Sequence, residues 1–329
     1  MFLGYIHYFR ALAITFIVAG HSIDALVWNN EDVERLIRIF LSNGSVLFVF
    51  IAGYLFQHLS NKLRGMRYFS SKVKNVILPY FLISIPAIII SVTIFEQDRV
   101  WSGFYEKSIW EQVVFFYLSG AHLAPLWFIP MICIFYLISP LLLELDKGRL
   151  IYVMIPVFMV ISCIVGRGLP HHSFVHFLSV YLLGMYFSKY KAEINPVISQ
   201  VSVIGLTLWL MIGLAMVEFL FTTATMSHWN YLQKLSMSVF FLGLFIRYNE
   251  HLTSKFVSRL ADNSFGIFFI HSYALTSGKI LYERSFGSLA DGNAVLLIGV
   301  IGGTLIVCFY LIEMIRTMFG KRSRMLVGS

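Results

Sequence analysis

A succession of long apolar segments constrains this chain more than any other feature of its sequence. Most are long enough, as helices, to cross about 30 Å of hydrocarbon. They lie near residues 8–28, 39–58, 76–95, 124–144, 150–166, 173–188, 200–221, 232–248, 264–282 and 294–316. The two shortest, 150–166 and 173–188, are marginal and leave open a tilted, paired or partly re-entrant arrangement. We therefore predict an all-α fold, a polytopic integral membrane bundle of about ten transmembrane helices, with residues 1–329 forming a single domain.

Composition and charge support this class. The chain is 58% hydrophobic and 13% charged, whereas about a quarter of the residues in a soluble domain are charged. A net charge of +8 could indicate nucleic-acid binding, but the basic residues stand in short clusters between apolar segments, as in cytoplasmic loops. Most of them fall on one side if the N-terminus is cytoplasmic. We predict no nucleic-acid partner and two cytoplasmic termini. The first segment is too long for a signal peptide and lacks a cleavage site, so it should remain a membrane span.

The sequence offers little sign of a metal or a bound cofactor. The three cysteines lie inside apolar segments without short spacings and are expected to be packing residues: Cys133, Cys163 and Cys308. Three histidines near a short outer loop have no accompanying carboxylate and are expected at the surface or the interface: His171, His172 and His176. There is no nucleophile elbow and no dinucleotide-binding glycine pattern. We predict no tightly bound cofactor.

The first apolar segment carries Arg10 and His21 with ten residues between them. In a helix this spacing places both side chains on one face, roughly 16 Å apart. A histidine inside the membrane indicates function by default, although one that only bonds a neighbouring helix would serve packing. Asp24 follows His21 by three residues and could orient its imidazole, as in hydrolytic triads. Asp24 could equally serve an acceptor entering from outside.

Two connections between the apolar segments are candidates for ligand binding. The loop from Asn61 to Asn75 holds five basic residues and, with Arg10, could bind phosphate groups on the cytoplasmic side; alternatively it only enforces topology or contacts anionic lipid. The outer connection 96–123 contains tryptophans and tyrosines among its charges. It is interpreted either as a lid or as an aromatic belt at the lipid headgroups.

Several blocks in order resemble acyltransferase family 3, a family of integral membrane proteins, over nearly the whole chain. Their residues are the Arg10–His21 pair; the second-segment stretch from Phe48 to Leu55; Lys72-Val73-Lys74-Asn75 before Pro79-Tyr80; Pro125-Leu126-Trp127-Phe128 followed by Pro140-Leu141; and Asn263 to His271. The chain departs from the family pattern in two places. Lysines stand where many members have paired arginines, and His7 stands where many have an acidic residue, which leaves the role of that position open.

The resemblance implies transfer of an acyl group, most often acetyl from cytoplasmic acetyl-CoA, to a sugar hydroxyl of a bacterial surface polysaccharide or its lipid-linked precursor. His21 is then the general base, or a nucleophile that carries the acyl group, with Asp24 beside it. The donor-binding candidates are Arg10, Lys72, Lys74, Trp127 and His271. Packing remains an alternative role for Trp127, and a structural role for His271.

The expected location is the bacterial inner membrane. The expected partners are acyl-CoA, the polysaccharide or lipid-linked acceptor, membrane lipid and, as an option that the sequence leaves open, a second copy of the chain. Two other function classes compete with the enzyme. One is a transporter or flippase of a glycan precursor or small solute, although the internal repeats and matching broken helices typical of transporters are not found. The other is a non-catalytic member of a glycan-assembly complex.

Overall fold

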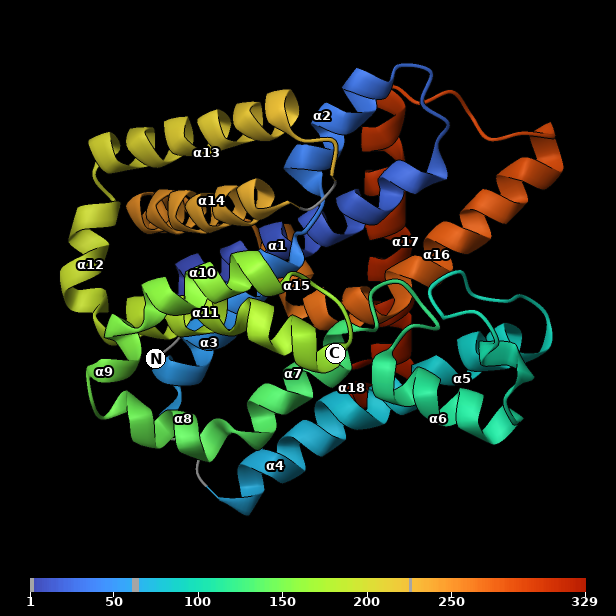
Figure 1. Ribbon diagram of the computed structural model, residues 1–329, viewed down its shortest axis with the longest axis horizontal. Coiled ribbons are helices and arrows are strands. Elements are labelled where there is room, and N and C mark those ends of the chain that lie inside the picture. The colour runs from blue at the N-terminus through green and yellow to red at the C-terminus, as the bar shows by residue number, and fades with distance from the viewer. Residues whose placement is uncertain (1–2, 61–64, 225–226) are drawn as a thin grey trace.

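The computed structural model describes residues 3–60, 65–224 and 227–329. These residues are helical apart from turns and loops, as Figure 1 shows. Within them there is no β-strand, and one isolated bridge joins Val27 to Asp291. The predicted all-α class is confirmed.

The first third of the chain forms long helices interrupted at two points. Asn43, with φ of +60°, lies at the break between the second and third helices, and a π-helical turn, Val73–Ile77, joins the fourth helix to the fifth. The helices are α1 (Gly4–Ser22), α2 (Glu31–Leu41), α3 (Ser45–His58), α4 (Met66–Lys72) and α5 (Leu78–Thr93).

The middle third consists of shorter helices. The outer connection 96–123 contains a helix of its own, which begins at a capping box: Ser108 Oγ accepts from the Glu111 N–H, and Glu111 Oε2 accepts from the Ser108 N–H. These hydrogen bonds hold the pKa of Glu111 below its ordinary value. The helices are α6 (Ile109–Ser119), α7 (Phe128–Leu137), α8 (Ser139–Asp146), α9 (Leu150–Val153) and α10 (Ile155–Val165).

The last part of the chain contains the longest helices. They are α11 (Pro170–Lys189), α12 (Lys191–Ile198), α13 (Val201–Phe221), α14 (His228–Arg247), α15 (Lys255–Asp262), α16 (Ser264–Phe286), α17 (Ala294–Phe319) and α18 (Ser323–Val327). A short turn of 3-10 helix, Gly320–Arg322, connects α17 to α18. Each of the ten predicted segments coincides with one or two of the observed helices.

Five helical stretches among the described residues are long and apolar enough to cross a membrane: Gly4–Ala25, Glu31–His58, Met66–Thr93, Val201–Phe221 and Ala294–Val327. The pair α7 and α8, bent by 56°, makes a sixth if it counts as one span. The chain is therefore a multi-pass membrane protein. The count of ten spans stays a prediction.

Helix α1 runs through the middle of the molecule (Figure 1) and contacts α3, α14, α15, α16 and α17. Its side chains Phe9, Ala13, Ile14 and Val18 are fully buried. Arg10 and His21 both lie on this one uninterrupted helix, which confirms the helix predicted for the first segment.

Helices α3 and α11 meet through their backbones. A Cβ at Gly53 would overlap the carbonyl oxygen of Tyr181, and a Cβ at Gly184 would overlap the carbonyl oxygen of Phe50. Small residues allow this close approach between membrane helices, where van der Waals packing drives association. Gly53 belongs to the stretch from Phe48 to Leu55 quoted above. The structure explains why this position holds a glycine: a larger residue would collide with α11.

We expect Gly53→Ala to separate α3 from α11 and to lower the free energy of unfolding by about 1–3 kcal/mol or more, the usual cost of overpacking. Thermal unfolding of the purified protein in detergent measures the change. Gly205→Ala in α13 is the matched control, because a Cβ there meets nothing and alanine favours a helix. Equal melting temperatures for both variants would contradict the proposed backbone contact.

Candidate functional site

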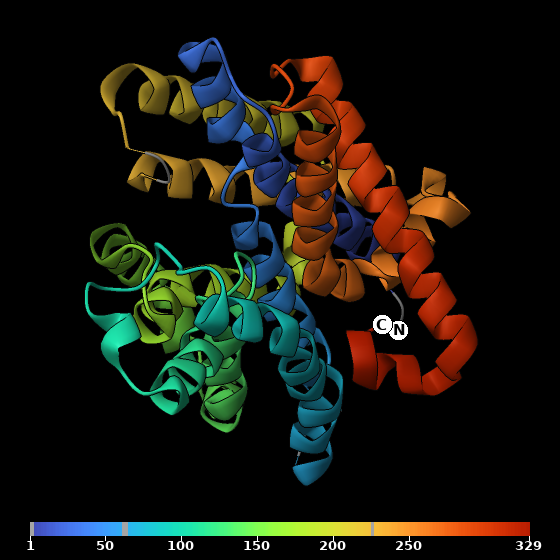
Figure 2. The same ribbon diagram turned by 90° about the vertical axis from the view of Figure 1, so that its right-hand side faces the viewer.

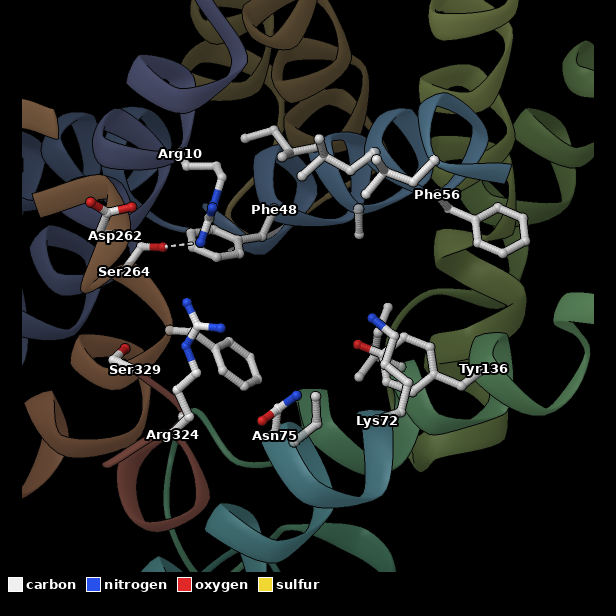
Figure 3. Close-up of a pocket in the computed structure, with 18 of the residues that line it drawn as sticks. Arg10, Phe48, Phe56, Lys72, Asn75, Tyr136, Asp262, Ser264, Arg324 and Ser329 are labelled. Carbon is white, nitrogen blue, oxygen red and sulfur yellow. Dashed lines mark hydrogen bonds between the residues drawn. The ribbon is translucent and has the colours of Figure 1, made fainter. Parts of the chain in front are cut away.

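A cavity of about 950 Å³ lies between α1, α3, the α4–α5 span, α7, α16 and the segment after α17 (Figure 3). Five basic side chains and one carboxylate, that of Asp262, line it among the described residues. The basic residues are Arg10, Lys72, Arg316, Lys321 and Arg324. This excess of positive charge suits a polyanionic ligand.

Arg10 enters the cavity from α1. Its Nη2 donates to Ser264 Oγ at 3.0 Å, and Figure 3 shows the guanidinium directed into the open space. Asp262 is close enough to act on it electrostatically. Asp262 Oδ1 also lies 3.9 Å from His7 Nε2, which is 2.9 Å from the Ser258 carbonyl oxygen. His7 therefore joins α1 to α15.

Of the two predicted lysines, only Lys72 reaches the cavity. Its Nζ lies 4.5 Å from the centre of the Tyr136 ring and 5.3 Å from that of Tyr68, a cation–π arrangement. Lys74 is exposed and is not among the residues that line the cavity. Asn75 and Tyr68 do line it, so the described part of the predicted loop contributes Tyr68, Lys72 and Asn75. Its basic residues Lys62 and Arg64 lie outside the described residues.

Sequence reasoning missed the three basic residues that reach the cavity from α17 and beyond. Arg316 donates to Glu313 Oε1 at 2.9 Å and to Asn263 Oδ1 at 2.5 Å. Lys321 and Arg324 follow the end of α17, and both are exposed. The distribution of charge assigns all three to the same side of the membrane as Arg10. That assignment alone does not indicate that they share a cavity with Arg10.

His21 lies next to His271 and away from the cationic cavity. The ring centres of the two histidines are 5.3 Å apart. His21 is half-buried, whereas His271 is fully buried. His271 Nδ1 lies 2.9 Å from the Phe268 carbonyl oxygen and 3.0 Å from that of Ile267. A carbonyl can only accept, so Nδ1 carries the proton and Nε2 is an acceptor; within the described residues Nε2 has no partner.

His271 is not among the residues that line the cavity with Arg10, and its role in donor binding stays a prediction. Asp24 is also placed differently from expectation. Its Oδ1 accepts from Arg38 Nη2 at 2.6 Å, its side chain is 65% exposed, and no hydrogen bond joins it to His21 in the described part of the chain. A catalytic role for Asp24 stays a prediction.

Trp127 lies beside Arg167, outside the cavity. The Arg167 guanidinium stands 4.3 Å above the Trp127 ring, and Trp127 stacks on Phe177 with 5.8 Å between centres. Burial lowers the pKa of Arg167 to about 10, so it stays protonated at neutral pH. Arg167 and Arg99 both act electrostatically on His21. Trp127 is not among the residues that line the cavity, and its role in donor binding stays a prediction.

An aromatic connection leads from the cavity to the histidines. Phe128 lines the cavity, and its ring centre is 5.4 Å from that of Phe268. Phe268 in turn lies 6.4 Å from His271. Two buried aromatic side chains, Phe128 and Phe268, therefore lie between the cavity and the histidines.

A buried polar network supports the break between α2 and α3. Lys234 is fully buried and donates to the carbonyl oxygens of Ile39 and Phe40, at 2.8 and 2.7 Å. These carbonyls belong to the last turn of α2, where no helical N–H reaches them. Asn230 Oδ1 accepts a hydrogen bond from Asn43 Nδ2 at 3.3 Å. Asn43 Oδ1 accepts from Arg167 at 3.2 Å, so the network extends to the surroundings of His21.

The helices and the basic cavity among them define a helical membrane protein with an internal cationic site. A family model described as an acyltransferase domain matches residues 3–313, so the chain belongs to acyltransferase family 3. No curated protein and no solved structure matches the chain. The family match confirms the resemblance seen in the sequence and favours an acyltransferase over a transporter.

Lys234→Met should lower the free energy of unfolding by about 1–3 kcal/mol, because the Phe40 carbonyl loses its donor, while the Ile39 carbonyl keeps its hydrogen bond from Asn230 Nδ2 at 3.0 Å. Thermal unfolding in detergent is the measurement. The control is Lys255→Met at an exposed position, which should leave the melting temperature unchanged. An unchanged melting temperature for Lys234→Met would show that the capping of α2 is dispensable.

Proposed function

We propose that the protein is an O-acetyltransferase of the bacterial inner membrane. It transfers acetyl from cytoplasmic acetyl-CoA to a sugar hydroxyl of a surface polysaccharide or its lipid-linked precursor. The observation that carries this proposal is that one helix, α1, presents Arg10 to the basic cavity and holds His21 beside His271 near its other end. The phosphates of coenzyme A and the acyl transfer are thereby assigned to opposite ends of the same helix.

The topology belongs to the same proposal. Ten spans with both termini in the cytoplasm place the basic cavity on the cytoplasmic side, where acetyl-CoA is found. All five cationic residues of the cavity come from segments assigned to that side by the distribution of charge. Arg99 and Arg167, which act on His21, come from segments assigned to the opposite side. The acceptor then approaches from outside, toward the half-buried His21 ring.

The donor binds with its phosphates among Arg10, Lys72 and the cations after α17, through charge-assisted hydrogen bonds. Its flexible pantetheine arm runs along α1 past Phe128 and Phe268, over roughly 16 Å of helix rise. Asn75 offers an amide to the same ligand. Lys72 supplies a point charge where an arginine would give a bidentate contact.

The chemistry requires one proton transfer in each direction. His21 takes the proton of the acceptor hydroxyl as its oxygen attacks the thioester carbonyl carbon. The tetrahedral intermediate collapses with cleavage of the C–S bond, and the coenzyme A thiolate takes the proton back from His21. His271 is the ring next to His21 and its Nε2 is an acceptor; a hydrogen bond from His21 to this atom would favour one tautomer of His21, the role that a carboxylate has in hydrolytic triads.

Acetyl transfer from radiolabelled acetyl-CoA into the glycan fraction of membranes tests the proposal. His21→Ala should lower kcat by about 10²–10⁴-fold, the usual contribution of a general base, with little change in KM for acetyl-CoA. Arg10→Ala should mainly raise that KM, because Arg10 contacts the phosphates. His228→Ala, at an exposed position, is the control. Equal incorporation by wild type and His21→Ala would overturn the assignment of the base.

The same assay distinguishes the roles of Asp24 and His271. We expect Asp24→Asn to retain most activity, since Asp24 is exposed and paired with Arg38, and His271→Gln to lose at least tenfold in kcat. The pH dependence of kcat distinguishes orientation of His21 from simple damage, because loss of an orienting partner shifts the profile. A large loss with Asp24→Asn alone would instead make Asp24 the partner of His21.

A further inference from the structure

The segment that follows Glu313, residues 314–329, lies beyond the part of the chain that matches the family. We call it the C-terminal arm. It completes α17, turns at Gly320–Arg322 and continues as α18, which packs against α5, the π-helical turn and α16. Figure 2 shows this segment, in red, turning back at the end of α17. The arm therefore forms one wall of the cavity.

The arm is held in place by specific contacts with α16. Ser329 Oγ accepts from the Gly266 N–H at 2.7 Å, and Ser323 Oγ donates to the Ser329 carbonyl oxygen at 2.7 Å. Gly328 has a φ of +78°, and a Cβ there would collide with the Phe265 ring. Val327 is buried. These contacts fix α18 at the mouth of the cavity.

Arg324 differs from the other arginines of the cavity. Arg10 bonds Ser264, and Arg316 is neutralised by Glu313. Within the described residues the Arg324 side chain makes no hydrogen bond or ion pair, and Figure 3 shows its guanidinium directed into the cavity opposite Lys72. An unpaired guanidinium at this place keeps all five of its donors for a ligand.

Depth in the cavity decides which part of the donor each arginine meets. Arg10 is half-buried and shares α1 with His21, whereas Arg324 is exposed at the mouth. The thioester must lie toward His21, so the opposite end of coenzyme A lies at the mouth. The phosphate at that end is the ribose 3′-phosphate, a dianionic group with three acceptor oxygens.

We propose that Arg324 binds the ribose 3′-phosphate of the donor and so selects coenzyme A over its dephospho form. This inference rests on the proposed function. It assigns a specificity residue to the arm, outside the matched domain, where Arg324 supplies the bidentate guanidinium that the lysine at position 72 does not provide.

The test compares two fragments that differ only in this phosphate, adenosine 3′,5′-bisphosphate and adenosine 5′-monophosphate. Their binding to the full-length protein in detergent is measured by calorimetry, which needs no turnover. Arg324→Ala should weaken binding of the bisphosphate by about tenfold or more, the loss of a charge-assisted hydrogen bond, and leave the monophosphate unchanged. Arg324→Lys should recover part of the loss. Arg322→Ala, an exposed neighbour outside the cavity lining, should match wild type.

The outcomes separate this inference from the proposed function. If wild type binds the bisphosphate and Arg324→Ala binds it equally well, the role of Arg324 is overturned while the donor assignment stands. Equal weakening for both fragments would place Arg324 at another phosphate and overturn the selectivity. If wild type binds neither fragment, the coenzyme A donor fails, and the inference fails with it. Thermal unfolding of each variant verifies that the fold is retained.

Discussion

The cost of placing a polar side chain inside a membrane helix shapes this structure more than any single contact. Arg10 and His21 belong to an otherwise apolar helix, and neither is tolerated against lipid. Helix α1 is therefore covered by α3, α14, α15, α16 and α17, with Arg10 at the cavity and His21 beside His271. The same cost explains Lys234, whose buried ammonium group donates to two helix-end carbonyls and to Gln233 Oε1.

The apolar pattern predicted the helices well, because burial in lipid or protein requires long apolar runs. It did not predict the interruptions. Asn43 lies inside an apparent single span, and its left-handed backbone is stabilised by Arg167 and Asn230, which are far away in the sequence. By its sequence position Lys234 is interpreted as one of the loop charges that set topology, but its side chain is fully buried. Tertiary partners of polar groups leave no trace in a hydropathy profile.

The sequence predicted the position of a candidate site residue only where the geometry of a single helix determines it. Residues two apart on a helix do not share a face, which accounts for Lys72 inside the cavity and Lys74 outside it. The pairing of Asp24 with His21 assumed one continuous helix, but α1 ends at Ser22 and the chain continues as a tighter turn. The proximity of His271 to His21, and of the C-terminal arm to Arg10, depends on contacts between distant segments.

The close approach of Gly53 to the Tyr181 backbone and of Gly184 to the Phe50 backbone has a mechanical consequence for the cavity. Two backbones that touch directly have no side chains between them to rearrange, so α3 and α11 form a stiff unit. Phe48, Ile51 and Ala52 of α3 line the cavity, so we expect this wall to keep its shape when a ligand binds. Two glycines that are not among the residues lining the cavity, Gly53 and Gly184, therefore help to set its width.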